Sequence, residues 1–321
     1  MSSQIFVSPS PHVHGPFSTK RIMADVIFAL IPAFAVSCMV FGLGVITLAL
    51  VSITSCVLLQ YLIERFIMKK RSTVGDLSAV VTGLLLAMNL PSTIEWWIVV
   101  VGAIVAIGIA KMPFGGIGKN PFNPAITARV FLLIAYPQQM TYFPQSMSSC
   151  VDAFSGATAL TAAKASAVDF ATVDHLNMLL GAQTGSLGET AALALLLGFA
   201  YLLFRKVITW HIPVSIFVTM ALMASCYGIF HFTTLSAVVS FAAFHLLAGG
   251  AILGAVYMAT DYVTSPMTKR GGVIFGVGIG LITMLIRLWG SFPEGMSFAI
   301  LIMNGVVPLI NKYVKPKRFG R

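Results

Sequence analysis

The sequence predicts an all-α polytopic membrane protein with about ten transmembrane helices. Two observations support this prediction. Hydrophobic residues make up 58% of the chain and charged residues only 9%, whereas a soluble domain carries about 25% charged residues. Apolar runs of about 17–25 residues, long enough to cross a bilayer, also recur along the chain. The lipid bilayer is therefore the first partner that the sequence predicts.

The predicted spans divide evenly between the two halves of the chain. They cover about 22–42, 44–67, 76–90, 95–111 and 124–136, then about 188–205, 211–229, 234–260, 272–289 and 294–311. The runs at 76–90 and 124–136 are short for a complete crossing. An odd number of spans in each half means that a repeated unit would be inverted in the second half. This predicts two inverted five-helix repeats.

Polar intervals divide the chain into five predicted parts. These are an N-terminal arm at 1–21, a first membrane repeat at 22–136, a polar loop at 137–188, a second membrane repeat at 189–311 and a basic tail at 312–321. The arm lacks the short apolar core and small-residue cleavage site of a secretory signal. His12 and His14 do not make a full metal-ligand set, so a solvated arm is favoured there.

Basic residues gather on alternate predicted loops, which indicates how the chain is oriented. One side receives Lys20 and Arg21, Lys69–Arg71, Lys111 with Lys119, Arg205 and Lys206, Lys269 and Arg270, and the tail. The other side receives Glu95, the 137–188 loop and Glu294, with Lys164 as the main basic exception. The positive-inside rule places both termini in the cytoplasm and the 137–188 loop outside. The net charge of +10 is therefore a topology signal, and nucleic-acid binding is not expected.

Two interrupted stretches end the third predicted span of each half. They are 87–93, with Asn89 and Pro91, and 259–268, with Asp261 and Pro266. In lipid, such breaks persist only where protein or water satisfies the freed backbone groups, and half-helix ends of this kind often bind substrates in transporters. The alternative is ordinary loop chemistry, because Pro, Ser and Thr end helices in all proteins.

Charged residues within predicted spans are costly and mark candidate sites. Asp25 and Asp76 lie near a cytoplasmic boundary, where snorkelling or a helix N-terminus stabilises a carboxylate. Arg129 lies deeper and requires a carboxylate or phosphate partner, and Asp261 belongs to the second interrupted stretch. For Arg129 and Asp261, a structural ion pair and a ligand contact are both open. Arg287 lies near an outer helix end.

Other short patterns predict packing rather than chemistry. The Gly115–Lys119 run lacks the spacing of a phosphate loop, so a re-entrant or helix-capping segment before Pro124 is expected. Glycines 272, 276 and 280 form a stripe for close helix packing. The four cysteines are scattered and no Cys-x-x-Cys is present, so neither a metal centre nor an iron–sulfur cluster is predicted. No catalytic constellation is visible either.

The 137–188 loop contains the sequence Asp152-Ala-Phe-Ser155-Gly156-Ala157-Thr158. Small residues surround a single threonine, which predicts an uncovered Thr158 hydroxyl open to modification. The pattern resembles the flavinylation motif of the membrane flavoproteins of the Rnf and Na⁺-pumping quinone reductase complexes. In those proteins a flavin transferase joins FMN to the last threonine through a phosphoester. An unmodified Ala/Ser/Thr-rich loop is the alternative.

The resemblance extends over nearly the whole chain. Ser8–His12, Thr19–Met23, Gly118–Pro124, Ser155–Thr158 and Ala259–Pro266 occur in the family's order. The chain therefore resembles the D subunit of the Rnf ion-translocating electron transport complex, which is similar to the B subunit of the Na⁺-pumping NADH:quinone reductase. Ala159 follows the motif threonine, where many relatives have proline.

The resemblance implies a fold, cofactors and partners. The fold would be ten helices in two inverted repeats, similar to urea transporters, in the cell inner membrane. Thr158 would carry covalent FMN, with Asp152 as the acidic residue of the motif and Ser155, Gly156 and Ala157 between them. Riboflavin would be a second, non-covalent cofactor. The partners would be the other Rnf subunits and a flavin transferase, and the complex would be a ferredoxin:NAD⁺ oxidoreductase that moves Na⁺ or H⁺.

Two other functions remain open from the residues. A transporter or channel for a small polar solute is suggested by the interrupted stretches, and it predicts solute flux without flavin. A structural scaffold for a larger assembly predicts that Thr158→Ala leaves electron transfer intact.

Overall fold

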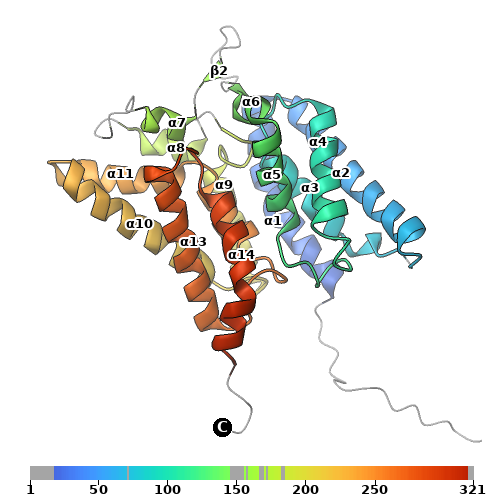
Figure 1. Cartoon of the computed structure of the whole chain (residues 1–321). Coiled ribbons are helices and arrows are strands. Elements are labelled where there is room, and N and C mark those ends of the chain that lie inside the picture. The colour runs from blue at the N-terminus through green and yellow to red at the C-terminus, as the bar shows by residue number, and fades with distance from the viewer. Residues whose placement is uncertain are drawn as a thin grey trace, which may run out of the picture.

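The structure is a computed structural model, and it describes residues 18–70, 72–144, 155–156, 158–165, 170, 173–181 and 185–316. Within these ranges the chain is almost entirely helical (Figure 1). The exception is one antiparallel pair of two-residue strands, β1 (Phe143–Pro144) and β2 (Ser155–Gly156). The predicted all-α class is confirmed.

The first half contains five helical segments of the predicted kind. They are α1 (Thr19–Phe41), α2 (Gly44–Leu62) continued by the π-helical η1 (Ile63–Ile67), α3 (Ser78–Met88), α4 (Trp96–Ala103) continued by the π-helical η3 (Ile104–Ile109), and α5 (Pro124–Ala135). A single 3₁₀ turn, η2 (Val74–Asp76), precedes α3. Pro124 begins α5 and the Asn123 side chain accepts from Ala125 N and Ile126 N, so the predicted helix-capping segment is confirmed.

Three short helices connect the first half to the second. The short helices are α6 (Pro137–Thr141), α7 (Ala159–Lys164) and α8 (His175–Leu180). The second half contains α9 (Ala192–Phe204), α10 (His211–His231), α11 (Leu235–Leu247), α12 (Ala251–Leu253) continued by the π-helical η4 (Gly254–Met258), α13 (Lys269–Trp289) and α14 (Met296–Tyr313).

The helices are long and apolar enough for a multi-pass membrane protein. Five could cross a bilayer by length and composition, namely α1, α2 with η1, α10, α13 and α14. A sixth candidate is the pair formed by α11 and α12 with η4, which bends by 60°. Shorter apolar helices occupy four predicted ranges: α3, α4 with η3, α5 and α9. Of these four, the sequence predicts a short helix only for α3 and α5.

The helices have two distinct ends. The start of α1 and the end of α14 lie at one end, which we call the terminal end (Figure 1). Helices α6, α7 and α8 and strand β2 lie at the opposite end, which we call the loop end (Figure 1). The start of α1 and the end of α14 thus lie opposite the short helices of the 137–188 segment, and the side of the membrane that each end faces stays a prediction.

Contacts between helices follow the same pattern in both halves. Helix α2 packs on α3 and α4, and α10 packs on α11 and α13. Helix α5 packs on η3 and α4, and α14 packs on α13. Two further pairs, α1 with α9 and α5 with α14, join the halves. Because each of these pairs matches the first or last helix of one half with its counterpart in the other, the contact map has a two-fold pattern.

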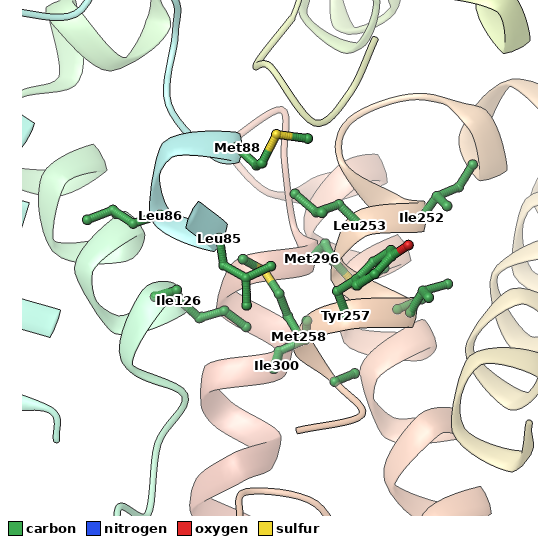
Figure 2. Close-up of a cluster of buried hydrophobic side chains, with 14 of the residues drawn as sticks. Leu85, Leu86, Met88, Ile126, Ile252, Leu253, Tyr257, Met258, Met296 and Ile300 are labelled. Carbon is green, nitrogen blue, oxygen red and sulfur yellow. The ribbon is translucent and has the colours of Figure 1, made fainter. Parts of the chain in front are cut away.

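The two broken helices, α3 and α12 with η4, meet in the centre of the hydrophobic core. Figure 2 shows Leu85 and Met88 of α3 across from Leu253 and Met258, among side chains that are almost fully buried. The Asn89 amide, just after α3, lies 3.6 Å from the Met258 sulfur. The predicted interruptions are therefore neighbours in space.

Protein groups satisfy the backbone where each broken helix ends. The Met88 carbonyl accepts from Gly188 N at 2.7 Å, and Leu90 O accepts from Leu187 N at 3.3 Å. At the other break, the Met258 carbonyl accepts from the Asn123 side-chain amide at 3.2 Å. Helix ends in an apolar interior require such partners. Both interruptions therefore meet the condition under which a helix can break at membrane depth.

The predicted glycine stripe is a helix contact. A Cβ at Gly276 would meet the Ser215 side chain and lie 2.9 Å from the carbonyl oxygen of Ile212. A Cβ at Gly280 would lie 2.9 Å from Ile216 O. Since the partners include backbone atoms of α10, only glycine allows α13 to approach so closely.

Candidate functional site

Thr158 caps the N-terminus of helix α7 at the loop end. Its hydroxyl accepts from Thr161 N at 3.2 Å and lies 2.8 Å from the Thr161 hydroxyl. The residue is only 8% exposed, so the predicted uncovered hydroxyl is wrong for the isolated chain. The cause is tertiary: Leu160 of α7 packs into a cluster with Met178 and Phe244 and draws the start of the helix onto the body of the protein.

The other motif residues lie on the chain just before Thr158. Ser155 and Gly156 form β2 and pair with Pro144 and Phe143 of β1. Asp152 and Ala157 lie outside the described residues. The β1–β2 pair thus holds part of the motif against the end of α6, and α7 follows directly.

Lys164, the main basic residue predicted on the same side as the 137–188 loop, links α7 to the second half of the chain. Its ammonium donates to the carbonyls of Gly290 at 2.5 Å, Phe292 at 2.6 Å and Ile286 at 3.3 Å. These carbonyls belong to the last turn of α13 and the segment that follows, where a cation is favourable. Partial desolvation lowers the pKa of Lys164 below its ordinary value. The charge is therefore used as a helix cap.

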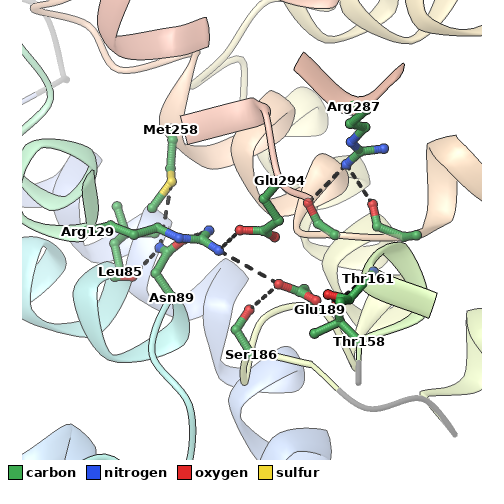
Figure 3. Close-up of polar contacts among 12 residues, drawn as sticks. Leu85, Asn89, Arg129, Thr158, Thr161, Ser186, Glu189, Met258, Arg287 and Glu294 are labelled. Carbon is green, nitrogen blue, oxygen red and sulfur yellow. Dashed lines mark hydrogen bonds and ion pairs between the residues drawn. The ribbon is translucent and has the colours of Figure 1, made fainter. Parts of the chain in front are cut away.

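A buried cluster of charges lies beside Thr158 (Figure 3). Arg129 of α5 donates to Asn89 Oδ1 at 2.6 Å and forms an ion pair with the Glu294 carboxylate. Glu189 Oε1 lies 3.8 Å from the same guanidinium and accepts from the Ser186 hydroxyl at 2.8 Å. The side chains of Arg129 and Glu189 are 7% and 4% exposed. The predicted need of Arg129 for a carboxylate partner is confirmed.

The same cluster sits at a glycine turn that splits α11 from α12. Gly249 and Gly250 have φ of +68° and +60°, a conformation that favours glycine. A Cβ at Gly250 would lie 3.4 Å from Glu294 Oε1 and 3.5 Å from an Arg129 nitrogen. The charged cluster therefore joins the end of α3, α5, and the starts of α9, α12 and α14.

Arg287 in the last turn of α13 is a further buried charge at the loop end, and it binds the end of α11. It is 3% exposed and donates to His245 O at 2.5 Å, Ala248 O at 2.9 Å and Gly249 O at 3.1 Å. Because these carbonyls end α11, the guanidinium acts as its C-terminal cap. Its Nε has no hydrogen-bond partner among the described residues.

A pocket opens between α7 and the second half of the chain. We call it the loop-end pocket; it holds about 1350 Å³ of empty space. Its walls include Leu160, Phe170, Tyr227, Phe241, His245 and Arg287. The ring of Phe170 stands edge-on to Phe241 at 4.9 Å between centroids, and Phe241 stands edge-on to His245 at 4.5 Å. The walls are thus aromatic with basic groups among them.

The three aspartates that the sequence marks as candidate sites do not bind Arg129. Asp25 of α1 binds Arg205 at 3.2 Å and accepts from the Tyr201 hydroxyl at 3.1 Å, which ties α1 to α9. Asp261 follows η4 and accepts from Thr264 at 3.3 Å. Asp76 ends η2 and is half-buried. Arg129 finds its carboxylates elsewhere, so Asp261 and Arg129 belong to separate parts of the molecule.

A second pocket lies between the start of α1 and the two broken helices. We call it the terminal-end pocket. It holds about 750 Å³ of empty space, and Ser78, Lys111, Asn120, Asn123, Thr260 and Asp261 line it. Lys111 is 3% exposed and donates to Ser78 Oγ at 2.7 Å and Gln60 Oε1 at 2.9 Å. The sequence predicts a loop charge at Lys111, whereas the structure buries it between helices.

Sequence reasoning misses Glu189 and Glu64. Glu189 stands at the edge of the predicted span at 188–205, where its carboxylate beside Gly188 is the available signal. Glu64 lies in η1, is 3% exposed and accepts from Gln60 Nε2 at 3.0 Å and from Thr73 N at 2.7 Å. Its place inside the predicted span at 44–67 is the signal there.

Comparison with known proteins identifies the family. Residues 6–320 match the family described as NQR2, RnfD, RnfE. The chain belongs to this family. It is 43% identical over 319 residues to the D subunit of the Na(+)-translocating ferredoxin:NAD(+) oxidoreductase complex of Acetobacterium woodii, covering 98% of this chain and 95% of that protein.

Two further relatives of the family are similar over comparable lengths. The D subunit of the proton-translocating ferredoxin:NAD(+) oxidoreductase complex of Clostridium ljungdahlii is 40% identical, over 98% of this chain and 96% of that protein. The D subunit of the ion-translocating oxidoreductase complex of Halorhodospira halophila is 36% identical, over 97% of this chain and 94% of that protein. The predicted resemblance to the D subunit of the Rnf complex is confirmed.

Proposed function

We propose that this chain is the D subunit of an ion-translocating ferredoxin:NAD⁺ oxidoreductase complex and carries electrons through FMN joined covalently to Thr158. The observation that carries the proposal is the full-length match to relatives named as such subunits, at 43% and 40% identity. The motif Ser155-Gly-Ala-Thr158 lies within the matched region. The chain would work with other Rnf subunits, which supply ferredoxin and NAD⁺ chemistry.

The residues around Thr158 fit a phosphate-linked flavin. The hydroxyl lies at the start of α7, and α7 forms part of the wall of the loop-end pocket. Arg287 and His245 of this pocket each carry a buried nitrogen without a hydrogen-bond partner among the described residues. When bound, the flavin supplies one- and two-electron transfer. The protein would hold the flavin at Thr158, and the tether would keep the effective concentration of the flavin high. The side chains around the flavin would set its polarity and its access to water.

Attachment requires the start of α7 to open. The Thr158 hydroxyl is buried and engaged with Thr161, so a flavin transferase reaches it only when α7 is displaced or before it packs. Helix α7 has six residues and is therefore too short to be stable alone. Attachment is accordingly expected before α7 packs against Phe244 and Lys164 caps α13.

Mass determination tests the flavin. The purified chain, co-expressed with a flavin transferase, should show a gain of one FMN less one water on the peptide holding Thr158. An unmodified peptide, with the transferase active on another target, would overturn the assignment and favour a solute transporter. The Thr158→Ala variant is the matched control, because it removes only the hydroxyl and the methyl group.

The membrane arrangement is also a proposal. Ten helices, in two inverted five-helix repeats like those of urea transporters, account for the two-fold pattern of helix contacts. Both termini would lie in the cytoplasm and Thr158 on the extracytoplasmic side of the cell inner membrane, as the positive-inside rule requires. Translocation is tested with the whole complex in liposomes: ferredoxin oxidation with NAD⁺ should drive Na⁺ or H⁺ across the membrane.

We also assign riboflavin, the second expected cofactor, to the terminal-end pocket. Its lining combines apolar side chains with a few polar groups, which is the general character of small-molecule sites. Apolar walls with Asn120 and Thr260 suit a planar ring with hydrogen-bonding edges. Extraction of the purified complex should release one non-covalent flavin, and Val81→Trp, which fills the pocket, should abolish it. Solute flux by the flavin-free chain would instead favour the transporter.

A further inference from the structure

A groove runs along the side of α2 that faces away from the hydrophobic core. Thr54, Leu58 and Tyr61 line it along the helix, and Val74 of η2 forms part of the opposite wall. The groove holds about 960 Å³ of empty space. Leu58 and Tyr61 are 58% and 44% exposed, whereas the buried residues of α2 lie on the other side of the helix. The groove is therefore open to whatever surrounds the chain.

A buried carboxylate holds the second wall of the groove in place. Glu64 in η1 accepts from Thr73 N at 2.7 Å and also binds the Thr73 hydroxyl. Its side chain is almost fully buried. Because Thr73 directly precedes η2, these bonds keep Val74 beside α2. The groove is therefore formed by specific contacts and is not a gap between loosely packed segments.

Three basic side chains gather where the groove reaches the terminal end. Arg65 follows Tyr61 by four residues, Lys69 and Lys70 come next, and all three basic residues are exposed. Lys69 has a φ of +50°, and after this turn Lys70 N donates to Glu64 O at 3.0 Å. The turn brings Lys70 back to the residue that precedes Arg65, so the positive charges are clustered.

These three cations have no counter-charge in the part of the chain that the structure describes. None of them forms an ion pair there. Glu64 is occupied by Gln60 and Thr73, and Asp76, the next carboxylate along the chain, does not pair with them. Basic clusters at a membrane surface attract the phosphates of anionic lipids. The cluster therefore favours a negatively charged occupant.

The length of the groove matches one leaflet of a bilayer. Residues 44–67 form one apolar span, and Thr54 lies near its middle. Thr54, Leu58, Tyr61 and Arg65 are spaced by three or four residues, so they share one side of the helix. From Thr54 to Arg65 the helix rises about 16 Å, and half of a hydrocarbon core of about 30 Å is about 15 Å. A lipid chain that starts beside Arg65 would therefore end near Thr54.

We propose that this groove binds an anionic phospholipid. One acyl chain lies along Leu58 and Tyr61 against Val74, and the phosphate binds Arg65 and Lys70. Tyrosine and arginine suit this depth, because both have an apolar body and a polar tip that reaches the interface. A helix of a neighbouring subunit would have to bring its own costly carboxylate to Arg65, whereas a lipid supplies the chain and the charge in one molecule.

The lipid site is separate from the proposed cofactor sites. Among the described residues, none from α2 lines the loop-end pocket or the terminal-end pocket. The inference therefore goes beyond the proposed electron transfer, and its test requires no bound flavin.

Photo-cross-linking tests the site. The purified chain is placed in nanodiscs of phosphatidylcholine with a small share of phosphatidylglycerol that carries a photoreactive group at the end of one acyl chain. Peptide mass should locate the cross-link near Thr54, within residues 53–58. The same photoreactive chain on phosphatidylcholine should label this region at least about fivefold less, because each nearby cation favours an anionic lipid by about that factor.

Variants separate the charge of the site from its shape. Arg65→Gln should lower labelling by phosphatidylglycerol about fivefold, and Arg65→Lys should keep most of it. The matched control is Arg270→Gln, which removes an exposed arginine that does not line the groove. Ser55, which lines the groove, tests the shape: Ser55→Trp should reduce labelling by both lipids, whereas Ser55→Ala should not.

Two results would overturn the proposal for the chain. They are equal labelling of residues 53–58 by the two lipids, and equal labelling of wild type and Arg65→Gln by phosphatidylglycerol, since either shows only general contact with the bilayer. The same cross-link is expected in the whole complex. Its loss there would give the groove to a neighbouring subunit and overturn the proposal for the assembled protein.

Discussion

Arg129 on α5 binds the carboxylate of Glu294, which lies 165 positions later in the chain. Glu294 precedes α14, and α5 and α14 are one of the two helix pairs that join the halves. Asn89, at the end of the broken helix α3, accepts from the same guanidinium at 2.6 Å. One arginine thus connects a broken helix of the first half to the start of the last helix. The loop end of the protein is held together by buried charge.

Removing one partner of this ion pair should destabilise the protein strongly. Arg129→Gln leaves Glu294 and Glu189 buried without their cation, which should cost about 3–5 kcal/mol. The check is thermal unfolding of the purified chain in detergent, where a large fall in the midpoint is expected. The matched control is Arg270→Gln, an exposed arginine, which should change stability by less than about 0.5 kcal/mol.

The double variant Arg129→Gln with Glu294→Gln gives the coupling between the two residues. Because both charges are then gone, we expect a loss smaller than the sum of the single losses by roughly 0.5–3 kcal/mol. Strict additivity of the two losses would show that the residues do not interact in solution.

Closer packing at the glycine stripe should not be tolerated. Gly276→Ala places a methyl group against Ser215 and 2.9 Å from Ile212 O, so α13 must move away from α10. Such overpacking costs about 1–3 kcal/mol, measured as a lower thermal midpoint. Gly44→Ala serves as the control, since a Cβ there meets no atom within 4 Å. An equally large loss in both variants would contradict close packing at Gly276.

Thr158 variants should separate the hydroxyl from the rest of the side chain. Thr158→Ser keeps an oxygen that can form the phosphoester and accept from Thr161 N, so some covalent flavin should remain. Thr158→Ala should have none, and its electron transfer within the complex should be lost. Peptide mass measures attachment, and NAD⁺ reduction by ferredoxin measures activity. Covalent flavin in the alanine variant would refute the assignment, and full activity there would favour the scaffold.

Single cysteines should report opposite sides of the membrane. In a background without native cysteines, Leu176→Cys on α8 and Tyr313→Cys at the end of α14 replace side chains that are 72% and 78% exposed. An impermeant thiol reagent added to intact cells should label the first and not the second, because α8 and the end of α14 lie at opposite ends of the molecule (Figure 1). The reverse pattern would invert the proposed topology.

Local patterns predict the helices because their causes are local. Hydropathy along 211–229 and 272–289 places α10 and α13, since an apolar run in a chain with few charges has only a helix to form in lipid. Pro124 after Asn123 predicts the start of α5 for the same reason: a cap acts within one turn. Alternate basic loops predict that the chain ends lie opposite α7, because loop charge sets orientation without reference to packing.

The sequence by itself determined the class, the family, the threonine in its motif and the helix ranges, except that the predicted single span at 234–260 is wrong, because a turn at Gly249 and Gly250 splits it. The tertiary structure alone decided which groups meet. It paired Arg129 with Glu189 and Glu294, buried Lys111 against Gln60, and covered the Thr158 hydroxyl through the packing of Leu160. The physical reason is distance along the chain: hydropathy and caps act over one helix, whereas ion pairs and pockets form between residues that only the fold brings together.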